Sequence, residues 1–299
     1  MKLIEQSVEL IPENKNIYKQ IEFAARTCYK SEDKITEDSA IKFVDNLIKR
    51  GHLAMLEHGT VYMFCDQDSD DFLEIANSSY SYLVVNDGNM YVTTNLRVIY
   101  ELFPDKYTEI ISKFGCSPTK YHQRRLQFKI ITSIAVGREL LRHRVFSPAQ
   151  ESTRWCNYSK NKFGNQLTFI KPYFLDLNTG KYGFCIMDGE TYIEGDGYIK
   201  PLCNKEVDNI FIKSCLQTEQ NYFDLISSGK TPQEAREVLS LPLKSEVVMT
   251  GFVDDWKRFI DVRYHEVTGP VVKSMKEIAS MINDLYNSWN EEFEKVNVL

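Results

Sequence analysis

Apolar residues recur at helical spacing in several stretches of this chain. Between Thr36 and Gly51 they stand three or four positions apart, at Ala40, Phe43, Val44, Leu47 and Ile48. This spacing places them on one face of a helix, which Thr36 can cap and Gly51 can end. Similar patterns predict helices over 14–29, 133–141, 204–228, 254–263 and 270–294. A further helix is expected from Thr231, because Thr231 and Glu234 can form a capping box and Pro232 suits the first helical position.

Shorter apolar segments predict strands over 3–8, 60–64 and 126–132. Two hairpins are also expected, with turns at Asn86-Asp87-Gly88-Asn89 and at Asp188-Gly189, because such turns require positive φ and Asp-Gly tolerates it. No repeat, low-complexity stretch or Pro/Gly-rich linker divides the chain. We therefore predict a single α+β domain over residues 1–299 that carries β-hairpin insertions.

The charge balance limits the classes of partner. The 299 residues hold 36 basic and 42 acidic side chains, a formal net charge of −6, which argues against coating nucleic acid by charge alone. No apolar run reaches the roughly 18 residues that cross a bilayer, and the charged N-terminus lacks a signal-peptide core. We expect a soluble, cytoplasmic protein with neither nucleic acid nor membrane as partner.

Cysteine and histidine spacing argues against a metal enzyme. The seven cysteines form no C-x-x-C pair, and the five histidines form no H-E-x-x-H pattern. The chain also lacks G-x-G-x-x-G, so no dinucleotide is expected on a Rossmann turn.

One basic segment stands out from this acidic background. Residues 138–154, here called the arginine motif, contain four arginines and a histidine. Guanidinium groups bind phosphate through paired N–H donors, and Ser152 can add a hydroxyl. Pro148 is expected to end the preceding helix and open a loop. The alternative is a solvated basic helix end, where arginines interact favourably with the C-terminal dipole.

The full spacing favours a ligand site. Arg142-His143-Arg144, seven residues, Ser152, one residue and Arg154 together resemble the signature of the flavin-dependent thymidylate synthases. Three further elements resemble that family in the right order: Ala24-Ala25-Arg26, Gly51-His52 with Glu57-His58, and Glu234-Ala235-Arg236 followed by Val238-Leu239. Arg263 lies 27 residues beyond Arg236, where the family has a second substrate arginine.

The resemblance implies a specific activity. The family methylates dUMP to dTMP with carbon from methylenetetrahydrofolate and reducing equivalents from NADPH through FAD, and its members bind FAD at subunit junctions of a homotetramer. By resemblance, the FAD-binding residues would be His52, Arg142, His143, Arg144, Gln150 and Arg258. The dUMP-binding residues would be Glu139, Arg142, Gln150, Glu151, Ser152, Thr153, Arg154, Arg236 and Arg263.

Arg263 is the candidate catalytic residue. By resemblance it would face the pyrimidine and favour loss of its N3 proton, because a fixed cation lowers the cost of an anion beside it. C5 could then attack the carbon donor without an enzyme nucleophile. Cys156, the cysteine nearest the motif, is interpreted as structural because no activating base is evident.

Several positions depart from the family pattern. The family commonly has glutamine at Glu139, and an ionised glutamate can only accept hydrogen bonds. Two family asparagines near the flavin correspond to Phe252 and Arg258, and a serine corresponds to Cys28. Residues 66–125 and parts of 157–203 have no counterpart in shorter relatives, so these are the expected insertions.

These departures leave two alternatives open. One is another pyrimidine-nucleotide C5 transferase, such as a hydroxymethylase or a dCMP-acting enzyme, since the Glu139 carboxylate could accept from a cytosine amino group. The other is a non-catalytic protein that binds nucleotide or nucleic acid and retains the phosphate clamp.

Overall fold

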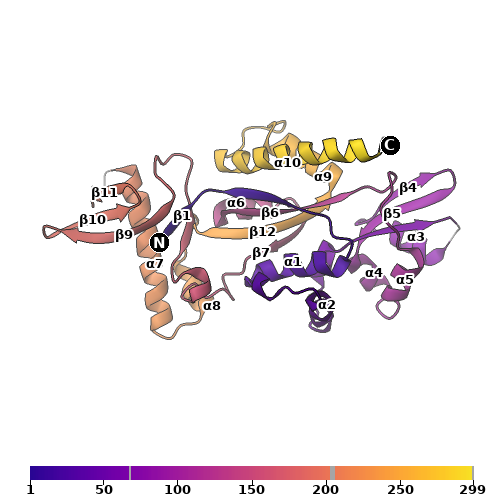
Figure 1. The fold of residues 1–299 in the computed structure, drawn as a ribbon, viewed down its shortest axis with the longest axis horizontal. Helices are drawn as coiled ribbons and strands as arrows, with labels where there is room; N and C mark the ends of the chain where they lie inside the picture. The colour runs from indigo at the N-terminus through magenta and orange to yellow at the C-terminus, as the bar shows by residue number, and fades with distance from the viewer. Residues whose placement is uncertain (67–68, 203–205, 298–299) are drawn as a thin grey trace.

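The fold is built around a four-stranded antiparallel sheet (Figure 1). The computed structural model describes residues 1–66, 69–202 and 206–297. In spatial order, the strands of this central sheet are β2 (Ser7–Ile11), β6 (Arg125–Ser133), β12 (Lys244–Phe252) and β7 (Ser147–Gln150). Strand β12 therefore lies inside the sheet, and β7 forms one edge.

Both faces of the central sheet are covered by helices. Alternate residues of a strand point to opposite faces, so Val247 and Met249 pack toward Trp256 of α9 (Val253–Arg263) and the long helix α10 (Lys273–Asn297). Val248 faces the other way and packs with Ala24 of α1 (Ile17–Tyr29). Figure 1 shows α9 and α10 on one side of β6 and β12, and α1 on the other.

The sequence patterns did not predict β12 or β7. Strand β12 is buried on both faces, so its apolar residues form a continuous run without the alternation of a half-exposed strand. Strand β7 contains Pro148, which was expected to end the preceding helix. That expectation is wrong, because α6 (Ile134–Leu140) ends earlier and Pro148 lies in the edge strand. An edge strand tolerates proline, since one side of it needs no N–H donors.

A three-stranded antiparallel sheet lies at one end of the molecule (Figure 1). Its order is β3 (Thr60–Cys65), β5 (Asn89–Asn95) and β4 (Tyr82–Asn86). Asp87 and Gly88 have φ of 50° and 78°, which confirms the first predicted hairpin. This sheet packs with the helices α3 (Asp70–Ala76), α4 (Leu96–Leu102) and α5 (Tyr107–Phe114) around a core of its own.

A five-stranded sheet lies at the other end (Figure 1). Its order is β11 (Tyr198–Pro201), β10 (Glu190–Gly195), β9 (Gly180–Met187), β1 (Lys2–Ile4) and β8 (Thr168–Ile170). Asp188 and Gly189 have φ of 52° and 78°, confirming the second hairpin. The prediction of one strand over 3–8 is wrong, because β1 and β2 belong to different sheets.

The predicted helices are confirmed with shifted ends. Beside those above, they are α2 (Ser39–Lys49), α7 (Val207–Ser227) and α8 (Pro232–Ala235). Thr36 is not the cap of α2, whose N-cap position is Asp38. The first two residues of the predicted 204–228 helix lie outside the described residues, as does Cys203. The capping box of Thr231 and Glu234 is present. The described residues also form short 3₁₀ segments, which are η1 (Glu32–Lys34), η2 (Leu53–His58), η3 (Asn161–Phe163) and η4 (Arg236–Val238).

The arrangement confirms the α+β fold class, whereas the single domain stays a prediction. Within the described ranges, no helix is long and apolar enough to cross a membrane.

We predict that Gly251→Ala destabilises the fold by about 1–3 kcal/mol, the usual cost of overpacking. A Cβ at Gly251 would lie 2.6 Å from Cε1 of Phe146, a buried ring that Trp256 holds at a centroid distance of 4.2 Å. Denaturant unfolding measures the effect. The matched control is Gly183→Ala on β9, where no atom lies within 4 Å of the added Cβ. Equal stability of the two variants would contradict this account of the packing.

Candidate active site

The arginine motif runs from α6 through a turn into β7. Helix α6 starts at Ser133, whose hydroxyl accepts a hydrogen bond from the amide of Val136 at 3.2 Å. The helix ends at the buried Leu140, so the arginine-histidine-arginine segment 142–144 falls in the turn that follows. Arg142 and Arg144 are exposed, and the histidine between them is half-buried.

His143 contacts Arg263, which lies 120 residues away in sequence. Arg263 is the last residue of α9, and its Nε donates to Nε2 of His143 at 2.9 Å. The imidazole also packs edge-on against Phe259, with ring centroids 4.9 Å apart. Burial, together with the charge of Arg263, lowers the pKa of His143 to about 4. The imidazole is therefore neutral at physiological pH and can accept the hydrogen bond.

The next part of the motif is fixed from both sides. Gln150 on β7 donates from Nε2 to the hydroxyl of Ser245 on β12 at 2.9 Å. The amide of Glu151 donates to the carbonyl of Glu246 at 2.8 Å, and the amide of Ser152 donates to the carbonyl of Cys28 at 2.9 Å. These contacts hold residues 150–152 between β12 and the end of α1.

Buried charges lie beneath this segment. Glu246 of β12 accepts from Lys244 at 2.7 Å and from Lys30 and Lys129 at 2.9 Å each, while Glu151 pairs with Lys244 at 2.7 Å. These five residues are here called the charge network. Both glutamate side chains are less than 10% exposed. Although burial opposes ionisation of Glu246, the lysines hold its pKa well below the usual range.

The end of the motif lies against α8. Nε of Arg154 donates to Oε1 of Gln233 at 3.3 Å, and its guanidinium lies 5.7 Å from the ring centroid of Trp155. Gln233 belongs to α8, which leads directly to Arg236. Arg236 is half-buried and lies 3.4 Å from a carboxylate oxygen of Glu237.

The remaining predicted residues take different positions. Glu139 is half-buried on α6, and Thr153 is half-buried beyond β7. His52 is exposed and lines a cavity of about 530 Å³ beside α1 and α2. Arg258 is exposed on α9, the helix that also carries Arg263.

Phe252, which the sequence analysis matched to a family asparagine, packs against side chains of this chain. Its ring lies 5.9 Å from the ring of Tyr82 on β4 and 5.5 Å from the guanidinium of Arg125. The predicted insertion 66–125 therefore packs against the end of β12 that leads into α9.

The sequence interpretation did not single out the lysines and the glutamate that support the motif from below. Lys30 follows the last residue of α1, Lys129 comes from β6, and Lys244 and Glu246 come from β12. One signal was available, because Glu246 directly precedes the apolar run Val247-Val248-Met249. A charged residue in such a run has to find a partner when it is buried. Among the described residues, no group of three or more His, Cys, Asp or Glu side chains is placed to hold a metal ion.

A comparison with known proteins identifies the family. The model of the Thy1 family, described as thymidylate synthase complementing protein, matches residues 117–290. This chain belongs to that family. The match spans the arginine motif, Arg236 and Arg263, and it confirms the resemblance found in the sequence.

Other comparisons add less. No curated protein matches this member of the Thy1 family. Solved structures of the UMP/dUMP methylase PolB from Streptomyces cacaoi are similar to it. The one bound with 5-Br dUMP has 16% identity and a TM-score of 0.45, over 96% of this chain and 93% of that chain. The one bound with 5-Br UMP has 15% identity and a TM-score of 0.44, over 96% and 91%.

We predict that Glu246→Gln lowers the free energy of unfolding at neutral pH by about 3–5 kcal/mol, because it leaves buried lysines without their partner. The native pKa of Glu246 lies below that of the unfolded chain. Its stabilisation is therefore complete above the unfolded pKa of about 4.3 and is lost as the pH falls below it. Denaturant unfolding across this pH range should show a weaker acid dependence in the variant.

The matched control for this prediction is Glu206→Gln, which removes an exposed glutamate that pairs with Lys200 at 3.1 Å. We expect it to leave stability unchanged. If both variants unfold at the same denaturant concentration at every pH, the charge network does not support the fold.

Proposed function

We propose that this protein methylates dUMP to dTMP, with methylenetetrahydrofolate as carbon donor, NADPH as reductant and FAD as bound cofactor. The observation that carries the proposal is the hydrogen bond from Arg263 to His143, which joins the arginine motif to the second substrate arginine. Family membership supports methylation of a pyrimidine nucleotide at a coarser level.

The residues proposed for FAD fit an anionic cofactor. Arg142 and Arg144 are exposed, and in the ranges that the structure describes neither has a carboxylate within ion-pair distance. Their guanidinium groups are free to bind a diphosphate through paired N–H donors. His52, His143, Gln150 and Arg258 complete the proposed set. When bound, FAD would supply the hydride chemistry that amino-acid side chains lack.

The nucleotide phosphate is assigned to the end of the motif. The contacts of Arg154 are to a neutral amide and an indole ring, so its charge remains available to an anion. Ser152, Thr153 and Arg236 would complete the phosphate site. The Glu151 carboxylate bonds Lys244 and Tyr158. Glu151 would therefore act by positioning Ser152.

Arg263 would stabilise the anion formed when the pyrimidine loses its N3 proton. The neutral imidazole of His143 holds the guanidinium without neutralising its charge. The electron density released to C5 would attack the one-carbon donor directly. Arginine suits this role because it stays charged when water is excluded.

The cysteine near the motif supports a reaction without an enzyme nucleophile. Cys156 is buried, and burial together with the charge of Glu151 raises its pKa to about 12. A thiol of this kind is protonated at neutral pH, whereas the nucleophilic form is the thiolate.

A homotetramer is proposed as the active assembly. Several candidate residues, including Arg142, Arg144 and Arg154, are exposed in the single chain and would be covered by neighbouring subunits. Sedimentation velocity of the purified protein tests this assembly, and a monomer that turns over dUMP would exclude it.

We predict that Arg263→Ala abolishes dTMP formation while the protein retains its flavin absorption. The reason is that the variant loses the fixed cation beside N3 but keeps the residues proposed for FAD. The comparison variant, Arg154→Ala, should keep a measurable turnover number and weaken dUMP binding about tenfold to a hundredfold, the value of a hydrogen bond to a charged group. Near-normal turnover in Arg263→Ala would remove Arg263 from catalysis. A colourless protein that FAD cannot reconstitute would favour the non-catalytic alternative.

Glu139 motivates the second candidate, an enzyme that acts on a cytosine nucleotide or adds a hydroxymethyl group. If the substrate is dUMP, calorimetry should give tighter binding for dUMP than for dCMP, and Glu139→Gln should preserve that order because glutamine can both donate and accept. Tighter binding of dCMP to the unaltered protein would favour the cytosine nucleotide. Product mass separates methyl from hydroxymethyl transfer.

A further inference from the structure

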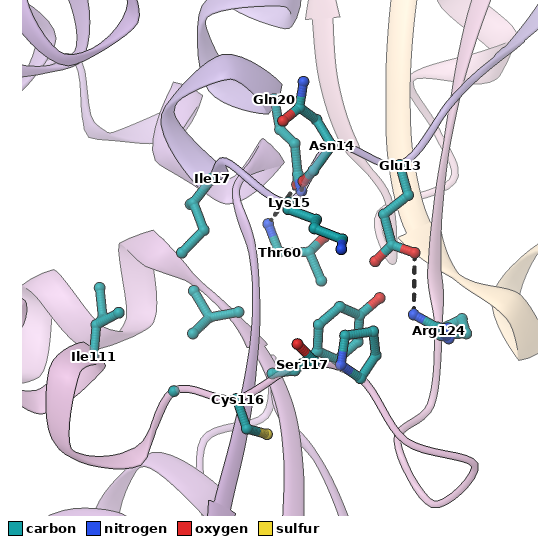
Figure 2. Close-up of a pocket in the computed structure, with 14 residues that line it drawn as sticks. Glu13, Asn14, Lys15, Ile17, Gln20, Thr60, Ile111, Cys116, Ser117 and Arg124 are labelled. Carbon is teal, nitrogen blue, oxygen red and sulfur yellow. Dashed lines mark hydrogen bonds and ion pairs between the residues drawn. The ribbon is translucent and has the colours of Figure 1, made fainter.

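A second cavity lies away from the arginine motif. It has a volume of about 640 Å³ and is formed where β3 and the chain after α5 meet the start of α1 (Figure 2). We call it the seam cavity, because residues 60–124 provide one side of it and residues 13–20 provide the other. Its size falls in the usual range for small-molecule sites, about 300–1,000 Å³.

Positive charge is concentrated on one side of the seam cavity. Lys15 extends into the space between Thr60 and Glu13 (Figure 2), and across the described residues no carboxylate lies within ion-pair distance of it. Arg124 pairs with Glu13 at 3.0 Å across the same side. Helix α1 begins at Ile17, and its dipole adds partial positive charge there, while the side chain of Asn16 accepts from the amides of Tyr18 and Lys19.

A buried arginine, Arg125, lies next to the positively charged side of the seam cavity. Arg125 donates to the carbonyl of Glu57 at 3.0 Å and to the hydroxyl of Thr60 at 3.4 Å, and its buried Nε has no hydrogen-bond partner among the described residues. It lines a smaller cavity of about 70 Å³ that shares Thr60 and Arg124 with the seam cavity. Glu13 therefore only partly balances the positive groups at this side.

A buried hydroxyl in the cavity wall lacks a hydrogen bond of ordinary length. Tyr62 is 7% exposed and lines the seam cavity, and its hydroxyl makes no hydrogen bond of ordinary length within the described part of the chain, although it interacts electrostatically with Glu13 and Arg124. The guanidinium of Arg124 lies 5.4 Å from the centroid of its ring. A buried hydroxyl without such a hydrogen bond is costly, and a ligand that hydrogen-bonds it would recover that cost.

The rest of the cavity wall is largely apolar and can contact a flat ring such as a nucleobase. Ile17 and Ile111 line the cavity with apolar surface (Figure 2), and the ring of Tyr62 is also part of the lining. Asn14 and Ser117 add polar groups at its rim. The cavity thus combines a cationic end, an apolar wall and a few hydrogen-bonding groups.

We propose that the seam cavity binds a nucleoside phosphate, with the phosphate beside Lys15, Arg124 and the N-terminus of α1 and the base against Ile17, Ile111 and Tyr62. Lysine, arginine and a helix N-terminus together suit phosphate. This site goes beyond the proposed methylation, since none of its lining residues belongs to the arginine motif. It also gives the segment 60–124 a ligand-binding role.

The test measures binding and location together. Calorimetry with dTTP, ATP and inorganic phosphate is performed on the Arg154→Ala variant. Its proposed dUMP site binds nucleotides more weakly, so binding at the seam cavity can be measured apart from it. In the same background, the exposed Cys116, which also lines the cavity, is changed to alanine, and Ser117→Cys then places one thiol at the cavity rim for alkylation. We expect dTTP or ATP to bind and to slow that alkylation about tenfold, while inorganic phosphate gives weaker protection.

Substitutions in the cavity wall should weaken this binding. Lys15→Ala and Tyr62→Phe should each reduce nucleotide affinity about tenfold, through loss of the charge or of the hydroxyl alone. The matched control is Lys19→Ala, on the same helix, because Lys19 pairs with Glu37 and does not line the cavity. Thermal unfolding confirms that each variant folds.

Three outcomes would overturn the proposal. They are no protection of the thiol by either nucleotide, equal protection by inorganic phosphate, and equal nucleotide affinity in the Lys15, Tyr62 and Lys19 variants. If Arg154→Ala does not alter dUMP binding, the proposed dUMP site fails, but protection of the Ser117→Cys thiol still reports the seam cavity.

Discussion

The ionised carboxylate of Glu246 is the interaction on which the candidate active site depends. Lysines from the C-terminal cap of α1, from β6 and from β12 pair with it, and one of them also pairs with Glu151 of the arginine motif. Such a buried set is stable only when every charge has a partner, because desolvation of a single ion is costly. The network therefore restricts where the motif can lie relative to α1 and β12. The residues after Glu151, which we propose for phosphate binding, are positioned by the same contacts.

The motif is thereby held by distant parts of the chain. Its first half contacts the end of α9 through His143 and Arg263, and its second half contacts α1 and α8 through Ser152 and Arg154. The two halves are joined by β7, which pairs with β12. In the ranges that the structure describes, the exposed Arg142, Arg144 and Arg154 form no ion pair with a carboxylate.

The candidate site was chosen from the sequence because most of its residues stand at fixed spacing in one segment, and their ligand roles stay predictions. The helices with one apolar face and the two Asp-Gly turns were predictable, since their signals are local. Strand β12 was not predicted, because burial on both faces removes the alternation of apolar and polar residues. Strand β7 was not predicted either, because Pro148 was interpreted as the end of a helix. The pairing of Lys30 with Glu246 depends on tertiary structure, as does the contact of Tyr82 with Phe252, and no local pattern reports either one.

Pro148 has a consequence for how copies of this protein meet. Strand β7 is an edge of the central sheet, and an unprotected edge invites pairing with a strand of another chain. Proline has no N–H, so it interrupts the row of donors that such an intermolecular sheet would need. Pro148, which the sequence analysis expected to end a helix, thus protects β7 against aggregation with other chains. It leaves side-chain contacts as the means by which another subunit can approach this edge.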